Sequence, residues 1–387
     1  MRLRHRDGTV VHLGYCTNVH PAEDLDGVLR QIRVFGGGVR ERLGADRLGL
    51  GLWLPAPLAR ELAADPALVG RLRAGLDEAG LETVTLNAFP YRGFQDPVVK
   101  HRVYHPDWTE RARLDYTVDC ARVLARLMPD DAARGSVSTL PLAWREPWDA
   151  GHLERARSHL VELAGVLAEL DEQGTPVRVG LEPEPGCVVE TTRDAARLLS
   201  GLPPQLGVCL DTCHTATGFE EAGPALDRLA GAGLPVVKTQ ASAAVEVADP
   251  RDPRAREALS DFAEDRFLHQ TRELVGVRAR GRDDLPEALA GPYPLPARGP
   301  WRTHFHVPLH AEARPPLRIT HGHLTDVLGH LFGGDRALTD HVEVETYTWS
   351  VLPEDRRPAG EEALVSGIAA EIAWARDRLT DLGLEPV

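Results

Sequence analysis

Segments typical of β-strands alternate with helical segments along this chain, and this alternation constrains the fold more than any other feature. The stretches between most β-like segments carry apolar residues at three- and four-residue spacing. The β-like segments span residues 10–18, 47–55, 82–90, 135–142, 177–184, 206–213, 235–242 and 341–349. Such alternation calls for a parallel sheet, and eight units favour a closed (β/α)₈ TIM barrel over an open doubly wound sheet. No Gly-x-Gly-x-x-Gly motif follows the first segment to support a dinucleotide-binding fold.

One interval breaks this rhythm, because almost one hundred residues separate the last two β-like segments. It contains a predicted helix over 255–274, a Pro- and Gly-rich run over 290–300 and a further β-like run over 303–310. Loops that follow barrel strands build the active face, so a long insertion here indicates function. A surface elaboration or dimer contact is the alternative. We predict a single TIM-barrel domain over 1–387, with residues 243–340 as an insertion that elaborates the active face.

Composition narrows the class of protein. The net charge of −14 argues against a surface that binds nucleic acid or anionic lipid. The N-terminal residues lack the apolar run of a signal peptide, and no segment offers 18 consecutive apolar residues, so we expect a cytoplasmic protein without membrane insertion. Scattered cysteines, odd in number, fit reduced thiols better than disulfides. They are Cys16, Cys120, Cys187, Cys209 and Cys213.

Polar side chains gather at the carboxyl ends of the last four β-like segments. They are Glu182 and Glu184, Asp211 and His214, Lys238 and Gln240, and Glu343 and Glu345. In a barrel these ends meet at one site, and side-chain alternation puts both glutamates of each pair on one face. So many carboxylates without a cation would have raised pKa values and would cost stability, so the pattern predicts a divalent metal ion. Taken singly, each acidic residue also fits a solvated strand end or a helix cap.

The ligand types narrow the metal only to a group of ions. Carboxylates and imidazole without thiolate suit Mn²⁺, Mg²⁺, Co²⁺, Fe²⁺ or Zn²⁺.

Several short motifs carry a resemblance to a known family. The glutamate in GLEPE, the Asp-x-x-His of DTCH and the glutamate in VEVET resemble the xylose isomerase-like barrel superfamily, which includes sugar isomerases, ketose 3-epimerases, inosose dehydratases and endonuclease IV. More narrowly, LGYCTNVHPAEDL, LHQT, RTHFHVPL and VEVETYTWSVLP are similar to the EboE family of metabolite-traffic proteins from bacterial ebo clusters. This narrower resemblance implies a role in an ebo-type pathway of metabolite biosynthesis or export, with possible contact to other proteins of that pathway.

The superfamily resemblance implies that Glu182, Asp211, His214 and Glu345 are metal ligands. Epimerases usually have a histidine where this chain has Gln240. A glutamine oxygen ligates a hard cation, though more weakly than imidazole binds Zn²⁺. Alternatively, His306 from the insertion supplies the missing nitrogen.

The resemblance also implies a reaction. In the related sugar enzymes a metal polarises an α-hydroxyketone, while two glutamates exchange a proton with the carbon between its oxygens; here Glu182 and Glu345 fit these roles. Lys238 and Arg302 are then candidates to hold a phosphate or carboxylate, or to stabilise an enediolate, although surface or structural roles are the alternative. We expect a small polyhydroxylated substrate such as a sugar or cyclitol.

Further residues at the predicted barrel mouth are candidates for substrate binding. They are Asn18, His20, Trp53 and Asn87 from the first three segments, and Arg302 and His304 from the insertion. A tryptophan ring beside polar groups suits the C–H face of a sugar, and ordinary loop packing is the alternative. If residues 303–310 are extended, His304 and His306 share a face and Phe305 points away.

Two other functions remain open at this point. An endonuclease IV-like phosphodiesterase would need several metals, more histidines and a basic face; His20, His304, His306 and His310 favour it, and the acidic charge opposes it. A carrier protein that keeps the metal pocket without turnover is favoured by Gln240. Turnover separates the enzyme from the carrier, and DNA binding separates the phosphodiesterase from both.

Overall fold

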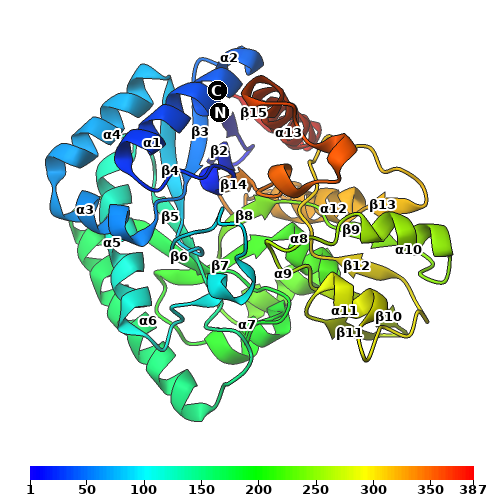
Figure 1. The fold of residues 1–387 in the computed structure, drawn as a ribbon. Helices are drawn as coiled ribbons and strands as arrows, with labels where there is room; N and C mark the ends of the chain where they lie inside the picture. Colours follow the sequence, from blue (N-terminus) through cyan, green and yellow to red (C-terminus); the bar gives the residue numbers. More distant parts are fainter.

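A computed structural model describes all 387 residues and confirms the (β/α)₈ barrel (Figure 1). Eight parallel strands form the ring, and each overlaps one predicted β-like segment. They are β2 (Val10–Cys16), β3 (Leu48–Leu52), β4 (Leu81–Asn87), β5 (Gly135–Thr139), β6 (Val177–Leu181), β7 (Leu206–Asp211), β8 (Val236–Ala241) and β14 (His341–Val344). Strand β14 pairs in parallel with both β8 and β2, so the sheet closes on itself.

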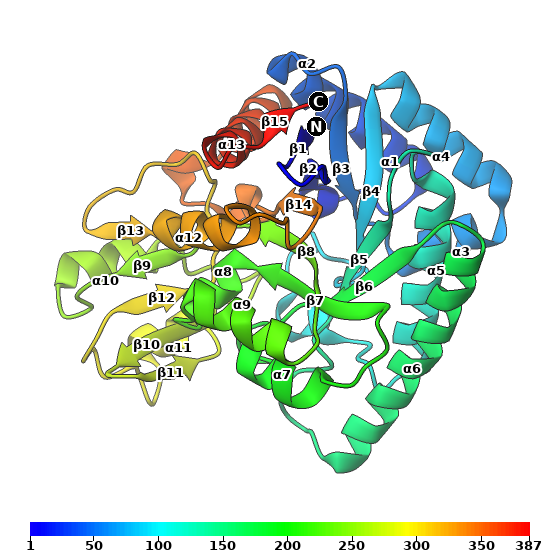
Figure 2. The same cartoon turned by 180° about the vertical axis from the view of Figure 1, so that it is seen from behind.

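Helices follow the strands and surround the ring (Figures 1 and 2). They are α1 (Leu25–Gln31), the π-helical η2 (Ile32–Gly37), α2 (Gly38–Leu43), α3 (Ala56–Ala64), α4 (Pro66–Glu78), α5 (Arg111–Leu127), α6 (Ala150–Glu172), α7 (Thr192–Leu199), α8 (Thr212–Thr217), α9 (Ala222–Gly231), α12 (His321–Phe332) and α13 (Glu361–Asp381). Side-chain caps begin several of these helices. Asp149 caps α6, and Gly174 follows the end of that helix with φ +78°.

Short elements complete the barrel. The 3-10 helices are η1 (Thr17–Val19), η3 (Lys100–Tyr104), η4 (Trp349–Val351) and η5 (Glu354–Arg356). Antiparallel strands β1 (Arg2–Arg4) and β15 (Glu385–Pro386) pair with each other, and β1 also pairs with β2, so the two chain ends lie side by side. No helix combines the length and the apolar character that crossing a membrane requires.

The stretch between β8 and β14 forms a second, five-stranded antiparallel sheet beside the barrel mouth, yellow-green to orange in Figure 1. Its order is β11 (Arg278–Arg282), β10 (Thr271–Val275), β12 (Trp301–Thr303), β9 (Val245–Val247) and β13 (Leu317–Ile319), with helices α10 (Pro253–Ser260) and α11 (Leu285–Ala290) beside it. The chain then returns through α12, which packs on α9 and α13 and takes the place of the barrel helix expected after β8. The assignment of 243–340 as an insertion within one domain stays a prediction.

The helix predicted over 255–274 is wrong in its second half. Helix α10 ends at Ser260, and residues 271–275 form strand β10 instead. Residues 271–275 form a strand because Gly276 adopts φ +62° and starts a tight hairpin that pairs β10 with β11. Strand β12 pairs with the other edge of β10. These long-range pairs override the helical spacing of the apolar residues.

Close packing inside the ring makes one glycine essential. Gly51 on β3 faces Glu343 on β14, and a Cβ atom on Gly51 would lie 1.3 Å from Glu343 Oε1. The Glu343 carboxylate cannot move aside easily, because it forms an ion pair with buried Lys238.

We predict that Gly51→Ala lowers the free energy of unfolding by about 3 kcal/mol or more, because the added methyl group overlaps a fixed carboxylate. Gly70→Ala is the matched control: Gly70 lies exposed in α4 with open space around its Cβ position. That change should stabilise the protein by about 1 kcal/mol through helix propensity. Urea denaturation measures both, and equal effects of the two substitutions would contradict this packing.

Candidate functional site

Three buried carboxylates meet where β6, β7 and β14 end. Glu182, Asp211 and Glu345 each place a carboxylate oxygen within 4.8 Å of the other two. Asp211 also caps α8: its Oδ1 accepts hydrogen bonds from the His214 backbone N–H at 2.9 Å and from Ser242 Oγ at 2.8 Å. The sequence thus brings these carboxylates together through the shared geometry of barrel strand ends.

The hydrogen bonds of these three carboxylates leave two of their buried oxygens without a partner. Glu345 Oε1 accepts from the side-chain amides of Asn18 and Asn87, each at 2.9 Å. Glu182 Oε2 and Asp211 Oδ2 are buried and have no hydrogen-bond partner. Unpaired buried carboxylate oxygens are costly, and a divalent cation would satisfy them. These residues therefore fit a metal ion.

Burial and mutual repulsion disturb the acidity of this group. Burial first, and then the neighbouring carboxylates, raise the pKa of Glu182 and of Glu345 well above the ordinary value. Burial alone would raise the pKa of Asp211 as well. At the low pH where Asp211 takes up a proton, positive charge on His214 and His306 and the two hydrogen bonds to Oδ1 outweigh burial and lower that pKa.

Three imidazoles stand next to the carboxylates. His304 Nε2 lies 3.1 Å from Nε2 of His214 and 3.1 Å from Nε2 of His306. Ligand atoms of His214, His306 and Asp211 also lie within 4.8 Å of one another. Two nitrogens bound to one tetrahedral zinc at about 2.05 Å lie about 3.3 Å apart, so each Nε2 pair has the spacing of two ligands of one ion.

The other ring nitrogens fix the protonation of these histidines. Nδ1 of His214 donates to the Pro183 carbonyl at 3.0 Å, and Nδ1 of His306 donates to the Glu345 carbonyl at 2.7 Å. Nδ1 of His304 lies 2.6 Å from the side-chain oxygen of Gln270. With Nδ1 protonated, each neutral ring turns an Nε2 lone pair toward its neighbours, an arrangement that needs a cation between the nitrogens.

A proton on one of the rings does not supply this positive charge at neutral pH. Burial lowers the pKa of His214 to about 4 and that of His304 well below its ordinary value, and the neighbouring rings lower the latter further. At neutral pH the rings are therefore uncharged, which is the state that binds metals.

Gln240 and His306, the two alternatives for the last ligand, lie in different surroundings. Gln240 is buried in β8, where its Oε1 accepts from Cys209 Sγ at 3.2 Å and its Nε2 has no partner. His306 instead turns Nε2 toward His304 at the mouth, and Phe305 points away to pack on Phe262. The geometry favours His306 as the nitrogen ligand, because its Nε2 is not engaged by a hydrogen-bond donor.

Lys238 does not join the predicted catalytic group. It lies wholly buried inside the ring, where it forms the ion pair with Glu343 and approaches Ser138 Oγ at 3.4 Å. Burial alone would lower the pKa of Lys238, but the Glu343 carboxylate raises it above the ordinary value. The amine stays protonated and bonded, so the structure gives it a place in the barrel interior and none at the mouth.

The predicted substrate-binding residues divide into two sets. Asn18, Asn87 and His304 line the pocket above the carboxylates. His20 stacks on Phe35, Trp53 donates through Nε1 to the Pro90 carbonyl, and Arg302 pairs with Glu246. The structure therefore does not bring His20, Trp53 or Arg302 into the pocket, because each contacts partners outside it.

The sequence alone places Glu184 at a strand end without a role of its own, and it does not single out Tyr104, Gln270 or Tyr347. Glu184 accepts hydrogen bonds from Tyr104 at 2.8 Å and from Gln270 at 3.3 Å, and burial raises its pKa to about 8. Tyr347 lies 3.4 Å from His304 Nε2. Gln270 belongs to the LHQT motif and Tyr347 to the VEVETYTWSVLP motif, so both motifs held a signal for these residues that we did not read.

We predict that Lys238→Met lowers the free energy of unfolding by about 3–5 kcal/mol, because it leaves the Glu343 carboxylate buried without its partner. The double variant Lys238→Met, Glu343→Gln should regain at least half of this loss, as measured by urea denaturation. A fully stable Lys238→Met protein would contradict the structural role of this pair.

The family model described as a xylose isomerase-like TIM barrel matches residues 41–268, which is more than half of the chain. No curated protein sequence matches. One similar structure is a xylose isomerase-like TIM barrel protein from Mycobacterium smegmatis in complex with magnesium, with 12% identity, a TM-score of 0.49 and coverage of 95% of this chain and 98% of that chain. Another is the IOLI protein with a bound zinc atom, with 14% identity, a TM-score of 0.46 and coverage of 96% and 98%. This chain therefore belongs to the xylose isomerase-like TIM barrel family.

Proposed function

We propose that this protein is a divalent-metal-dependent isomerase, epimerase or lyase that acts on a small metabolite with a hydroxyl group next to a carbonyl. One observation carries the proposal: buried carboxylate oxygens without partners adjoin imidazole Nε2 atoms that face one another at 3.1 Å. A cation at the barrel mouth would bind both the unpaired carboxylate oxygens and the imidazole nitrogens. Glu182, Asp211 and Glu345 would hold it with imidazoles of the group His214, His304 and His306.

The residues around the metal would divide the chemistry among them. The metal would polarise the hydroxyl and carbonyl oxygens of the substrate. Glu182 and Glu345 would take a proton from the carbon that bears the hydroxyl group, next to the carbonyl, and return it. Asn18 and Asn87 would hold the Glu345 carboxylate in position through their hydrogen bonds. A raised carboxyl pKa favours such proton exchange near neutral pH.

The motif resemblance to the EboE family supports a place in an ebo-type pathway of metabolite biosynthesis or export. A carrier that binds its metabolite without turnover uses the same pocket, and it is the main alternative. Fold alone does not separate the two.

Metal uptake tests the site directly. We predict that the protein retains about one divalent ion per chain by elemental mass spectrometry. The pKa values of Glu182 and Glu345 are raised in the metal-free protein, so metal binding should release protons from these carboxyl groups. Metal affinity should therefore rise with pH, and calorimetry in buffers of different ionisation enthalpy should report proton release.

Variants locate the ion. Asp211→Ala and His306→Ala should each lose it, whereas His330→Ala, a half-exposed residue of α12, should keep it. Retention of the ion by both site variants would place the metal elsewhere, and no uptake of Zn²⁺, Mn²⁺ or Co²⁺ would refute the proposal.

Hydrogen exchange tests turnover without knowledge of the product. In ²H₂O the metal-loaded protein should exchange the carbon-bound hydrogen next to the carbonyl in one member of a panel of ketoses, inososes and aryl α-hydroxyketones, as followed by NMR. Glu182→Gln and Glu345→Gln should each slow this exchange at least ~100-fold, because each removes a carboxylate base. Binding of a panel member without exchange would instead establish the carrier.

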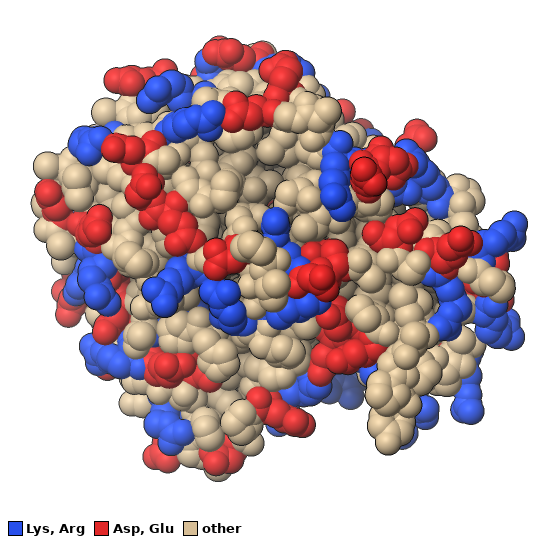
Figure 3. All heavy atoms as spheres, in the orientation of Figure 1, with Lys and Arg blue, Asp and Glu red and all other residues tan.

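A phosphodiesterase is the second candidate, favoured by the line of imidazoles beyond the carboxylate group, which offers ligands for more than one ion. His304 and His306 belong to this imidazole group. His20 instead packs on Phe35, and His310 packs on Trp349. Acidic and basic side chains are interspersed on the face in Figure 3, without a continuous basic surface. Two or more bound ions together with hydrolysis of bis(p-nitrophenyl) phosphate would support this candidate.

A further inference from the structure

The pocket above the candidate metal centre has two unlike parts. The space not filled by protein atoms is about 490 Å³, a volume that includes open solvent. Its floor presents Glu182, His304 and Glu345. Its walls come from the loop after β4 and from residues before β10 and after β14, and they are largely apolar.

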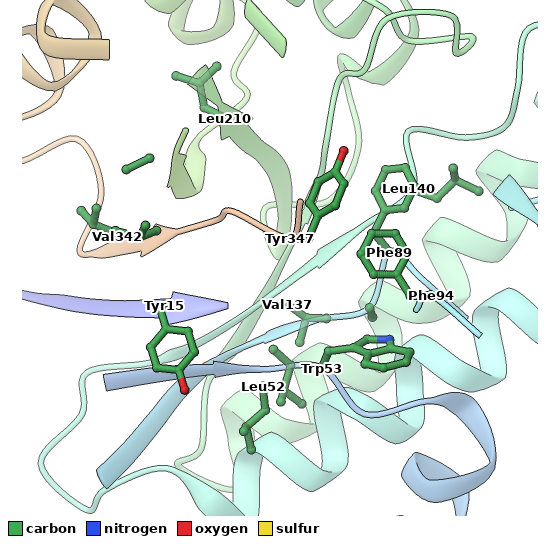
Figure 4. Packing of buried hydrophobic residues seen from close by; sticks show 14 of the residues in the cluster. Tyr15, Leu52, Trp53, Phe89, Phe94, Val137, Leu140, Leu210, Val342 and Tyr347 are labelled. Atoms are coloured by element: carbon green, nitrogen blue, oxygen red, sulfur yellow. The ribbon is translucent and has the colours of Figure 1, made fainter. Parts of the chain in front are cut away.

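Aromatic rings form half of the wall. Phe94 lies 5.1 Å from both Phe267 and Tyr347, and Phe267 lies 4.8 Å from Tyr347, measured between ring centroids. Phe89 lines the pocket as well. Figure 4 shows Phe89, Phe94 and Tyr347 beyond the ends of the barrel strands. Phe94, Phe267 and Tyr347 thus form one cluster of contacting rings, and the Tyr347 hydroxyl lies 3.4 Å from His304 Nε2.

The polar groups of the wall are already bonded within the protein. The Tyr104 hydroxyl donates to Glu184, and the Tyr347 hydroxyl lies against His304. Lys100, the one cationic residue that lines the pocket, donates to Asp284 at 2.6 Å and to the Glu264 carbonyl at 3.1 Å. The wall therefore offers little to the several hydroxyl groups of a sugar chain and no free cation to a phosphate.

We propose that the substrate joins a metal-chelating hydroxyl and carbonyl pair to a flat apolar group of about the size of a phenyl ring, and that it carries no phosphate. This inference rests on the proposed function and narrows its substrate class. The polar head sits on the floor with the metal, and the ring lies against Phe94, Phe267 and Tyr347. Aromatic rings stack well in such surroundings, and burial of apolar area stabilises the complex.

Three probes with the same α-hydroxyketone head test the tail. They are 2-hydroxyacetophenone with a phenyl tail, dihydroxyacetone with a hydroxymethyl tail, and dihydroxyacetone phosphate. By calorimetry on the zinc-loaded protein, 2-hydroxyacetophenone should bind at least tenfold tighter than either of the others. Equal binding, or tighter binding of either polar probe, would overturn the inference.

Substitutions of wall residues test whether the wall causes the preference for the phenyl-tailed probe. Phe94→Ala should reduce the phenyl preference at least fivefold with unchanged zinc content, and Phe94→Leu, which keeps more of the packing, should reduce it less. Phe219→Ala is the matched control, because Phe219 stacks under Arg302 outside the pocket. A phenyl preference unaffected by Phe94→Ala would remove the wall from recognition.

The outcome separates this inference from the proposed function. Zinc-loaded protein that binds the probes equally would overturn the substrate class and leave the metal site intact. Protein that takes up no metal but still prefers 2-hydroxyacetophenone would refute the metal chemistry and support the apolar wall.

Discussion

Charge compensation at the carboxyl end of the barrel is the constraint on which the rest of the site depends. The buried carboxylates there are Glu182, Glu184, Asp211, Glu343 and Glu345. So many carboxylates in a dry interior repel one another, and each must be protonated, paired or bound to a cation. The fold compensates the carboxylate charges in more than one of these ways, at different depths along the barrel axis.

Deep in the barrel a carboxylate is compensated by an ion pair, and nearer the mouth the carboxylates form a candidate metal centre. Inside the ring, Lys238 neutralises Glu343, and Gly51 leaves room for the carboxylate. Nearer the mouth no lysine or arginine reaches the group of Glu182, Asp211 and Glu345, and neutral imidazoles stand beside it. A divalent ion there would satisfy both kinds of ligand, and the aromatic wall above would exclude water and strengthen its interactions.

Sequence reasoning found the parts whose positions follow from periodic rules. The eight strands were visible because buried parallel strands are apolar runs with polar residues at their ends. The same rule brought together Glu182, Asp211, His214 and Glu345. It does not show that Lys238 lies inside the ring, because a strand-end list does not say whether a side chain faces inward below the mouth or outward at it. It also does not place Trp53, which donates to the Pro90 carbonyl, or Arg302, which pairs with Glu246 on β9, because these partners are distant in the sequence.

The sequence by itself determined the barrel, the strand-end carboxylates and the pair of histidines on one face of an extended run, since these depend on local alternation and on strand order. Only the tertiary structure decided that His306 rather than Gln240 turns a free nitrogen toward the mouth, that Gln270 orients His304, and that Phe94, Phe267 and Tyr347 meet as one wall. These contacts join the loop after β4, the insertion and the segment after β14, and no periodic pattern specifies how such loops pack.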